Sequence, residues 1–252
     1  MQSNSYIKLI KIFLAQFLYL LFPARIVFFF FDIFTIAKKK KEVLNTPSNV
    51  ALNIFGNKFV MHLEKDSHQN AGYIETSKGE SIYEETMIFC LSNILSKTKK
   101  VIFLDIGSYI SYYGLFVSSF TKDEGIIYAI ESNPNYIEIS ERSKKHNKYK
   151  NIINANIILS DKCEEYLVHN LTVIKKKYLI SYKEQTKLYD KYEKKELDDI
   201  LENGIAFQST TLDKFCSFNS IAPNIIKMDV HGSEGLILKG ATNTLANSVD
   251  YI

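Results

Sequence analysis

Apolar runs alternate with helical periodicities along most of the chain. Short apolar runs typical of buried strands occupy residues 101–104, 126–130, 151–159 and 223–230. Apolar residues at helical spacing occupy residues 110–120, 133–146 and 233–246. Strands that alternate with helices predict an α/β fold built on a parallel sheet.

Other segments surround this alternation. Residues 49–63 alternate on either side of Gly56-Asn57, which predicts a β-hairpin. Residues 65–80 are polar and predict a loop, and residues 84–95 carry apolar side chains at helical spacing. Residues 164–208 are mixed and charge-rich, so they predict no defined architecture beyond a helical patch near 184–201.

The N-terminal region is unusually apolar and ends in a basic run. Residues 7–37 are long enough to span a bilayer, but Arg25 and Asp32 would be costly near its centre. We expect two short helices, kinked at Pro23, that lie in a membrane interface. The run Lys38–Lys41 suits an anionic lipid surface. A spanning helix and a helix packed on a soluble domain remain alternatives.

Composition limits the remaining possibilities. The chain of 252 residues is long enough for one large domain at 46–252 and an N-terminal appendage at 1–45. A net charge of +3 is too small to indicate a nucleic-acid partner. The cysteines Cys90, Cys163 and Cys216 lack metal-ligand spacing, which predicts free thiols, no metal site and a cytoplasmic protein.

The stretch from Val101 to Phe120 combines a buried strand, a tight turn and a helix. Asp105 follows the apolar run, and Gly107 lets the backbone turn sharply close to a ligand. This order is half of a nucleotide-binding βαβ unit. The helix N-terminus offers N–H donors beside the carboxylate, so the site suits a zwitterionic or cationic ligand.

Acidic residues follow all of the expected core strands. They are Asp105, Glu131, Asp161 and Asp229. Ligands of open parallel sheets bind outside the carboxyl ends of the strands. Glu131 suits the two ribose hydroxyls, and Asp161, with Ser160 beside it, suits the adenine amine. A single acid of this kind is as well explained by a helix cap or a solvated loop, but the ordered series predicts a nucleoside-bearing ligand.

A second group of ionisable residues lies between Lys227 and Glu234. Lys227 and Asp229 are two apart on an expected strand and therefore point the same way. His231, with an ordinary pKa near 6.5, follows and could deprotonate a substrate hydroxyl. The alternative is that His231 faces solvent and that Glu234 stabilises a helix N-terminus.

These motifs together resemble the FkbM-type methyltransferases. The resemblance covers about residues 80–252 and rests on Phe103-Leu-Asp-Ile-Gly107, Tyr128-Ala-Ile-Glu-Ser-Asn-Pro134, Ser160-Asp-Lys162, Thr210-Thr-Leu-Asp213 and the run Ile226 to Ala241. It implies a Rossmann-like class I methyltransferase sheet with helices on both faces. It also implies S-adenosylmethionine as cofactor and a glycan, saccharide or small-molecule hydroxyl as acceptor.

The resemblance assigns roles to particular residues. The cofactor-binding set it implies is Asp105, Gly107, Ser108, Tyr109, Glu131, Ser160 and Asp161. Asp229 would lie near the methyl group, and Glu234 would belong to the active-site turn. His231 stands where the family usually has glutamate, which puts a fixed catalytic role at that position in doubt.

Further departures from the family pattern leave two rival hypotheses open. Ser111 replaces a usual glycine, Tyr109 could crowd the amino-acid end of the cofactor, and the chain ends within an expected strand at 250–252. We therefore also consider a truncated, non-catalytic relative that binds a nucleoside ligand or a membrane partner. A nicotinamide-dependent oxidoreductase is disfavoured because the glycine pattern is weak.

Overall fold

The computed structural model describes residues 47–65, 67, 69–169, 172–175 and 198–252. The chain divides into two compact units, one of residues 1–47 and 65–71 and one of residues 48–64 and 72–252. In the first unit, the N–H of Asn70 donates to the carbonyl of Ser67 (3.3 Å) where a helix begins. The second unit carries the motifs.

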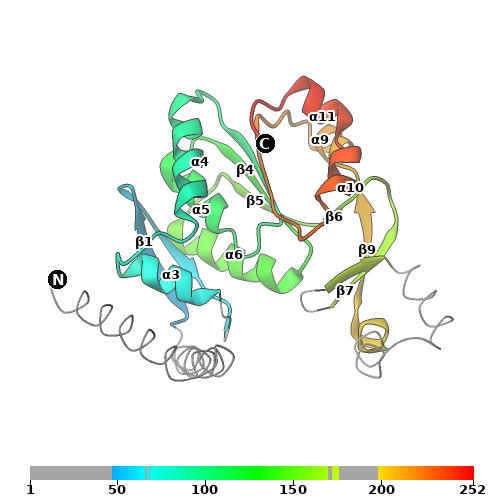
Figure 1. The fold of residues 1–252 in the computed structure, drawn as a ribbon, viewed down its shortest axis with the longest axis horizontal. Helices are drawn as coiled ribbons and strands as arrows, with labels where there is room; N and C mark the ends of the chain where they lie inside the picture. The colour runs from blue at the N-terminus through cyan, green and yellow to red at the C-terminus, as the bar shows by residue number, and fades with distance from the viewer. Residues whose placement is uncertain (1–46, 66, 68, 170–171, 176–197) are drawn as a thin grey trace, which may run out of the picture. The chain divides into compact units, whose positions relative to one another are not determined.

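The strands and helices alternate through most of the second unit (Figure 1). The strands are β1 Asn49–Ile54, β2 Asn57–His62, β3 Ile102–Ile106, β4 Ile126–Glu131, β5 Ile152–Asn156, β6 Ile158–Leu159, β7 Glu165–His169, β8 Thr172–Lys175, β9 Ile205–Thr210 and β10 Ile225–Met228. The helices are α3 Asn70–Ser77, α4 Glu85–Lys97, α5 Tyr112–Phe120, α6 Pro134–Asn147, α9 Leu212–Phe218, α10 Glu234–Lys239 and α11 Thr242–Asn247.

The central sheet is parallel, with the strand order β10-β3-β4-β5. Its register pairs Asp105 with Lys227 on one side and with Ala129 on the other. Tyr251 adds an isolated parallel bridge to Ile225 beyond β10. The predicted parallel α/β sheet is therefore confirmed for these strands, and the ends of β3, β4 and β10 meet at one edge.

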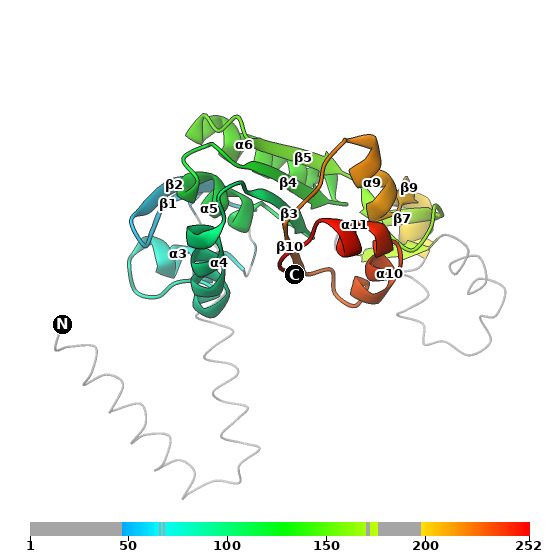
Figure 2. The same ribbon diagram turned by 90° about the horizontal axis from the view of Figure 1, so that it is seen from above.

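Helices cover both faces of this sheet. Alternate strand residues enter two separate cores, because successive side chains of a strand point to opposite faces. Phe103, Ile127 and Ile225 pack with α4, α5 and α6. Leu104 and Ile130 pack with α9 and α10. In Figure 2, α5 and the orange and red helices α9 to α11 accordingly lie on opposite sides of the strands.

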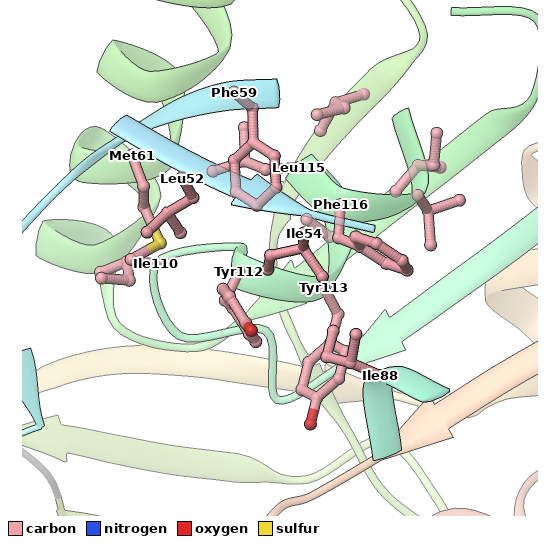
Figure 3. Close-up of a cluster of buried hydrophobic side chains, with 14 of the residues drawn as sticks. Leu52, Ile54, Phe59, Met61, Ile88, Ile110, Tyr112, Tyr113, Leu115 and Phe116 are labelled. Carbon is pink, nitrogen blue, oxygen red and sulfur yellow. The ribbon is translucent and has the colours of Figure 1, made fainter. Parts of the chain in front are cut away.

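The predicted hairpin is confirmed as β1 and β2, paired from Asn49↔His62 to Ile54↔Asn57. Its apolar face enters the core that contains α5. Figure 3 shows Leu52, Ile54 and Phe59 of the hairpin beside Leu115 and Phe116 of α5.

The predicted third strand, residues 151–159, is two strands in two sheets. The side-chain amide of Asn156 donates to the carbonyls of Glu131 and Ser132 (2.9 Å each) at the end of β5. After Ile157 the chain forms β6, which pairs in parallel with β9. β9 also pairs with β7, giving a second sheet of order β6-β9-β7-β8. Pairing with distant β9 has no local sequence signal.

The expectation of a loop at 65–80 was wrong, because α3 occupies residues 70–77. Tyr73 is buried and its ring packs on Tyr83 and Tyr112, with centroids 4.7 and 5.2 Å away. Thr76 ties this helix to the following loop by accepting a hydrogen bond from the N–H of Tyr83 (2.8 Å). Tyrosine contacts that span the fold therefore stabilise a helix in a locally polar stretch.

The single helix predicted for residues 233–246 was also wrong. Two helices, α10 and α11, are separated by Gly240 and Ala241. The carboxylate of Asp213 accepts hydrogen bonds from the N–H groups of Asn243 and Thr244 (3.0 and 2.7 Å), so it starts α11. Ser233 precedes α10 but its side chain makes no capping hydrogen bond.

Two predictions fall outside the described residues: the paired N-terminal helices at 7–37 and most of the helical patch near 184–201, of which residues 198–203 are described and helical. No helix within the described part of the chain has the length and apolar character needed to cross a membrane.

Candidate functional site

The turn between β3 and α5 meets the end of β10. Gly107 has a φ of +74°, and a Cβ placed there would lie 2.0 Å from the carbonyl oxygen of Asp229. The N–H groups of Gly107 and Ser108 both donate to the carbonyl of Ile130 (2.9 and 3.0 Å). Glycine is therefore required sterically, and the turn is fixed against both neighbouring strands.

Asp105 lies on the α5 side of the sheet and its side chain is fully buried. Neither carboxylate oxygen makes a hydrogen bond of normal geometry with the described residues, although the N–H of Gly114 in α5 is close enough to lower the pKa of the carboxyl group. The ammonium of Lys227 lies 3.4 Å from Oδ1 and also donates to the carbonyl of Gly107 (3.3 Å). Burial raises the pKa of Asp105, and the positive charge of Lys227 opposes that rise.

Two serines in the same turn also bury hydroxyl groups without a hydrogen-bond partner among the described residues. They are Ser108 and Ser111. Ser111 has a φ of +65° in the left-handed region, which explains why glycine is usual at this position. Buried polar atoms are nearly always paired in native proteins, so unpaired ones gathered in one turn indicate a polar ligand.

Glu131 ends β4 beside this turn. Its Oε2 accepts the N–H of Tyr109 (3.0 Å), and its Oε1 accepts the N–H of Asn133 (2.8 Å) and the hydroxyl of Ser132 (3.2 Å). Burial raises the pKa of Glu131, and these donors oppose the rise. A carboxylate has about four acceptor positions, so room remains for a further donor.

The side chain of Tyr109 is held by two other residues. Its hydroxyl donates to the carboxylate of Glu64, just after β2. Its ring packs edge-on against Tyr136 of α6, with centroids 4.5 Å apart. Tyr109 has a φ of +51°, so the turn contains two non-glycine residues in the left-handed region. The backbone of Tyr109, rather than its ring, is what contacts Glu131.

Ser160 and Asp161 follow β6, in the second sheet, and not a strand of the central sheet. The hydroxyl of Ser160 lies 3.1 Å from Oδ1 of Asp161 and 2.9 Å from the hydroxyl of Tyr166. Gly240 packs directly against the carbonyl of Ser160, where a Cβ would lie 2.3 Å away. Asp161 therefore follows a strand, as expected, but that strand belongs to the second sheet, and the role of Asp161 toward a ligand stays a prediction.

Asp229, His231 and Glu234 follow β10. Asp229 lies beyond the last strand residue, and its side chain is 55% exposed. His231 is 89% exposed, with Nδ1 3.9 Å from Oδ1 of Asp229. Glu234 accepts the N–H of Val230 (3.0 Å), and this bond lowers the pKa of its carboxyl group. Glu234 thus holds the turn, as expected for an acid in a first helical turn.

Glu84 was not anticipated from the sequence. It precedes α4 with a left-handed φ of +50°, and its carboxylate accepts the hydroxyl of Tyr113 from α5. Negative charge on Glu84 and Asp229 helps to raise the pKa of Tyr83, after burial. A buried tyrosine hydroxyl needs a partner, which was the available signal, but the sequence could not identify that partner.

Comparison with known proteins assigns the family. The family model described as the methyltransferase FkbM domain matches residues 105–251, more than half of the chain. The chain belongs to the FkbM methyltransferase family. The match begins at Asp105 and so includes the turn, Glu131 and the residues after β10.

Solved structures resemble this FkbM family member only distantly. One is the S-adenosylmethionine-dependent methyltransferase from Agrobacterium tumefaciens, with a TM-score of 0.33, 11% identity, and 57% of this chain and 38% of that chain covered. Another is TYW2 from M. jannaschii in complex with AdoMet, with a TM-score of 0.28, 16% identity, and 45% and 48% covered. A protein-L-isoaspartate O-methyltransferase has a TM-score of 0.27, 15% identity, and 32% and 31% covered. The chain spans less than half the length of each.

No curated protein matches this FkbM family member.

S-adenosylmethionine is the cofactor of the FkbM family. The described residues fit that molecule. The buried carboxylate of Asp105 and the buried hydroxyls of Ser108 and Ser111 make no hydrogen bond of normal geometry within the described part of the chain. S-adenosylmethionine carries an ammonium, a carboxylate and ribose hydroxyls, which can supply both kinds of partner. Glu131 lies at the neighbouring strand end with acceptor capacity left.

Proposed function

We propose that this chain transfers a methyl group from S-adenosylmethionine to a hydroxyl group of a glycan, saccharide or small-molecule acceptor. The observation that carries the proposal is the set of unpaired buried polar atoms on Asp105, Ser108 and Ser111, around a turn that admits only glycine at position 107. Family membership supplies the class of reaction.

Each residue of the donor site has a distinct task in this proposal. The Gly107 turn receives the amino-acid end, because the unpaired buried groups of Asp105, Ser108 and Ser111 surround it. Glu131 accepts the ribose hydroxyls. Asp161 and Ser160 take the adenine amine, which requires the β6 segment to face the same ligand as the end of β4. When bound, the cofactor supplies an electrophilic methyl group on its sulfonium.

Asp229 is the residue proposed to handle the acceptor proton. The acceptor oxygen attacks the methyl carbon as the carbon–sulfur bond breaks, and the hydroxyl proton passes to Asp229 or to water. Asp229 suits this task because it is exposed and its backbone carbonyl touches the Gly107 turn. His231 is largely exposed, and its Nδ1 lies 3.9 Å from Oδ1 of Asp229, so we assign it a secondary role.

The charges around Asp229 favour a neutral acceptor. Two exposed carboxylates, Asp229 and Glu84, both raise the pKa of Tyr83 through their negative charge. A second anionic group on the acceptor would be repelled there, whereas sugar hydroxyls can donate hydrogen bonds to carboxylates. This supports a glycan or polyol acceptor over a carboxylic or phosphate-bearing one.

Donor binding is tested first, by calorimetric titration with S-adenosylmethionine and S-adenosylhomocysteine. We expect micromolar binding that Glu131→Ala weakens about 10-fold or more, because a charge-assisted bond from the ribose hydroxyls is lost. The matched control is Glu138→Ala, an exposed glutamate on the neighbouring helix α6. A folded wild-type chain that binds neither ligand would refute the proposed function.

Methyl transfer is tested next with radiolabelled donor and a panel of saccharide hydroxyl acceptors. We expect Asp229→Asn to lower the transfer rate about 100-fold or more while donor affinity stays within about threefold of wild type. His231→Ala should lower the rate by less than about tenfold. Tight donor binding without transfer to any acceptor would support the rival, a non-catalytic binding protein.

A further inference from the structure

A lysine beneath the proposed donor site makes three contacts at once. The ammonium of Lys227 lies 3.4 Å from Oδ1 of Asp105, donates to the carbonyl of Gly107 (3.3 Å) and sits 4.9 Å from the ring centre of Tyr113. Its side chain is 13% exposed, and Asp105 is fully buried. The sheet register places Lys227 directly opposite Asp105, on adjacent strands.

We propose that Lys227 is a positioning residue for cofactor binding: it compensates the charge of buried Asp105 and fixes the Gly107 carbonyl, so that the first βα turn keeps its binding shape. This inference rests on the proposed function. Gly107 cannot be held by side-chain packing of its own, since the space where a Cβ would lie is occupied by the Asp229 carbonyl. Its carbonyl therefore depends on a donor from β10.

The contacts of Lys227 exclude a purely solvent-facing role. Removing its charge leaves a fully buried carboxylate whose nearby donor in the described residues is the N–H of Gly114, with no positive charge beside it. A buried, uncompensated charge is strongly destabilising. Stability and ligand affinity must therefore be measured separately, because a loss of stability alone would make Lys227 a structural residue.

The experiment is a double-mutant cycle with Lys227→Met and Asp105→Asn, read by thermal unfolding and by calorimetry with S-adenosylhomocysteine. K227M should lower the melting temperature, and D105N/K227M should recover most of that loss because no buried charge remains. Affinity should behave differently. K227M should weaken binding about tenfold in the wild-type background and also in the D105N background, since the donor to Gly107 is missing in both.

A pH profile supplies the second readout. Three charged or titratable groups face Asp105. Lys227 lies on β10, Asp229 directly follows β10, and Tyr113 lies on α5. Without Lys227, burial raises the pKa of Asp105 against only the N–H of Gly114, so its protonated form persists to higher pH. K227M should then bind S-adenosylhomocysteine more tightly as pH rises from about 5.5 to about 7.5, where the ligand amine stays protonated, and this change should be larger than in the wild-type chain.

Lys144→Met is the matched control, because Lys144 forms an ion pair of the same 3.4 Å length with Glu141 at the surface of α6. It should change neither affinity nor its pH profile. The positioning role is overturned if K227M has no effect on affinity in the D105N background, or if K227M and wild type share one pH profile. A folded wild-type chain that binds no ligand refutes the proposed function, and this inference with it.

Discussion

At the scale of single residues, two glycines with positive φ allow backbone strain to be separated from steric clash. Gly107 and Gly56 have φ values of +74° and +86°. A Cβ at Gly107 would lie 2.0 Å from a backbone oxygen, whereas a Cβ at Gly56 would meet nothing within 4 Å. The left-handed backbone penalises alanine at both positions, but only Gly107 also requires a strand end to move.

Gly107→Ala should therefore lower the free energy of unfolding by about 3 kcal/mol or more, because a backbone carbonyl cannot yield as a flexible side chain does. Gly56→Ala should cost about 1 kcal/mol, the strain of a left-handed residue alone. Urea denaturation of both variants measures the difference. Equal losses in the two variants would contradict the close approach of the Gly107 turn to the end of β10.

Residue-scale chemistry could be predicted where it is local. Asp105, Gly107 and Glu131 follow short apolar runs, and the structure places all three around one turn. The partner of Asp105 was not predictable, because Lys227 lies 122 residues further along and reaches it only through strand pairing. For the same reason, the sequence gave no reason to select Glu84 as the acceptor of the Tyr113 hydroxyl.

At the scale of elements, two side chains of α6 attach the hairpin: the hydroxyl of Ser143 accepts the N–H of His62 (2.9 Å), and Asn147 bonds Val60 twice. The side-chain amide of Asn147 donates to the carbonyl of Val60 (2.6 Å), and its oxygen accepts the N–H of Val60 (2.8 Å). The same amide donates to the carbonyl of Ser143 one helical turn earlier (2.7 Å). Asn147 therefore forms hydrogen bonds with both the N–H and the carbonyl of Val60.

Asn147→Ala should lower the free energy of unfolding by about 2 kcal/mol more than Asn247→Ala. Asn247 is the matched control, because it makes the same bond to the carbonyl one turn earlier, Asn243, at 2.7 Å. The difference isolates the two bonds to Val60. Chemical denaturation followed by circular dichroism measures both variants, and indistinguishable midpoints would mean that the two bonds to Val60 do not stabilise the attachment of the hairpin.

The same contact between β2 and α6 predicts a pH dependence. Burial lowers the pKa of His62, and the positive charges of His146 and Arg142 lower it further. Nε2 of His62 lies 3.3 Å from Nδ1 of His146. A histidine whose pKa is depressed by folding contributes stability above its ordinary pKa of about 6.5, and this contribution is lost as pH falls through the folded value.

His62→Gln should therefore flatten the fall in melting temperature of the wild-type chain below about pH 6.5. Buried carboxyl groups with raised pKa values, Asp105 and Glu131, act in the opposite direction and are common to both proteins. Comparing the two thermal profiles removes their contribution. Parallel profiles would show that protonation of His62 does not weaken the attachment of the hairpin.

The start of a helix was predictable where the capping residue is its neighbour in the sequence. It was not predictable where the capping residue lies far away in the chain. The side chain of Asn133 accepts the N–H of Asn135 (2.9 Å) and starts α6, as the Asn-Pro pair predicts. The start of α11 depends on Asp213 instead, some thirty residues earlier, so the sequence indicated one continuous helix.

At the scale of the whole molecule, alternating strands and helices predicted the parallel sheet, but not how the third strand divides between two sheets. β6 belongs to the second sheet because it pairs with β9, and β9 follows a long charge-rich segment. The position of Asp161 relative to Glu131 consequently depends on the second sheet. Prediction from local sequence pattern is weakest where the structure depends on pairing between strands that are far apart in the chain.

The final prediction concerns the chain as a whole and its apolar N-terminal region. We propose that residues 7–41 bring the domain to an anionic membrane surface, because a long apolar stretch is followed by the four lysines 38–41. The full-length protein should sediment with vesicles that contain phosphatidylserine, and less so at high salt.

Replacing all four lysines by glutamine should weaken vesicle binding by about tenfold or more, since each lysine near an anionic surface contributes about 1 kcal/mol. The control with the same change in charge is K144Q/K145Q/K148Q/K150Q, four lysines in and just after α6. If both variants lose binding equally, general charge and not the N-terminal region attracts the protein. Binding that resists high salt and alkaline washing in every variant would instead favour a spanning helix, since peripheral attachment through lysines is reversed under those conditions.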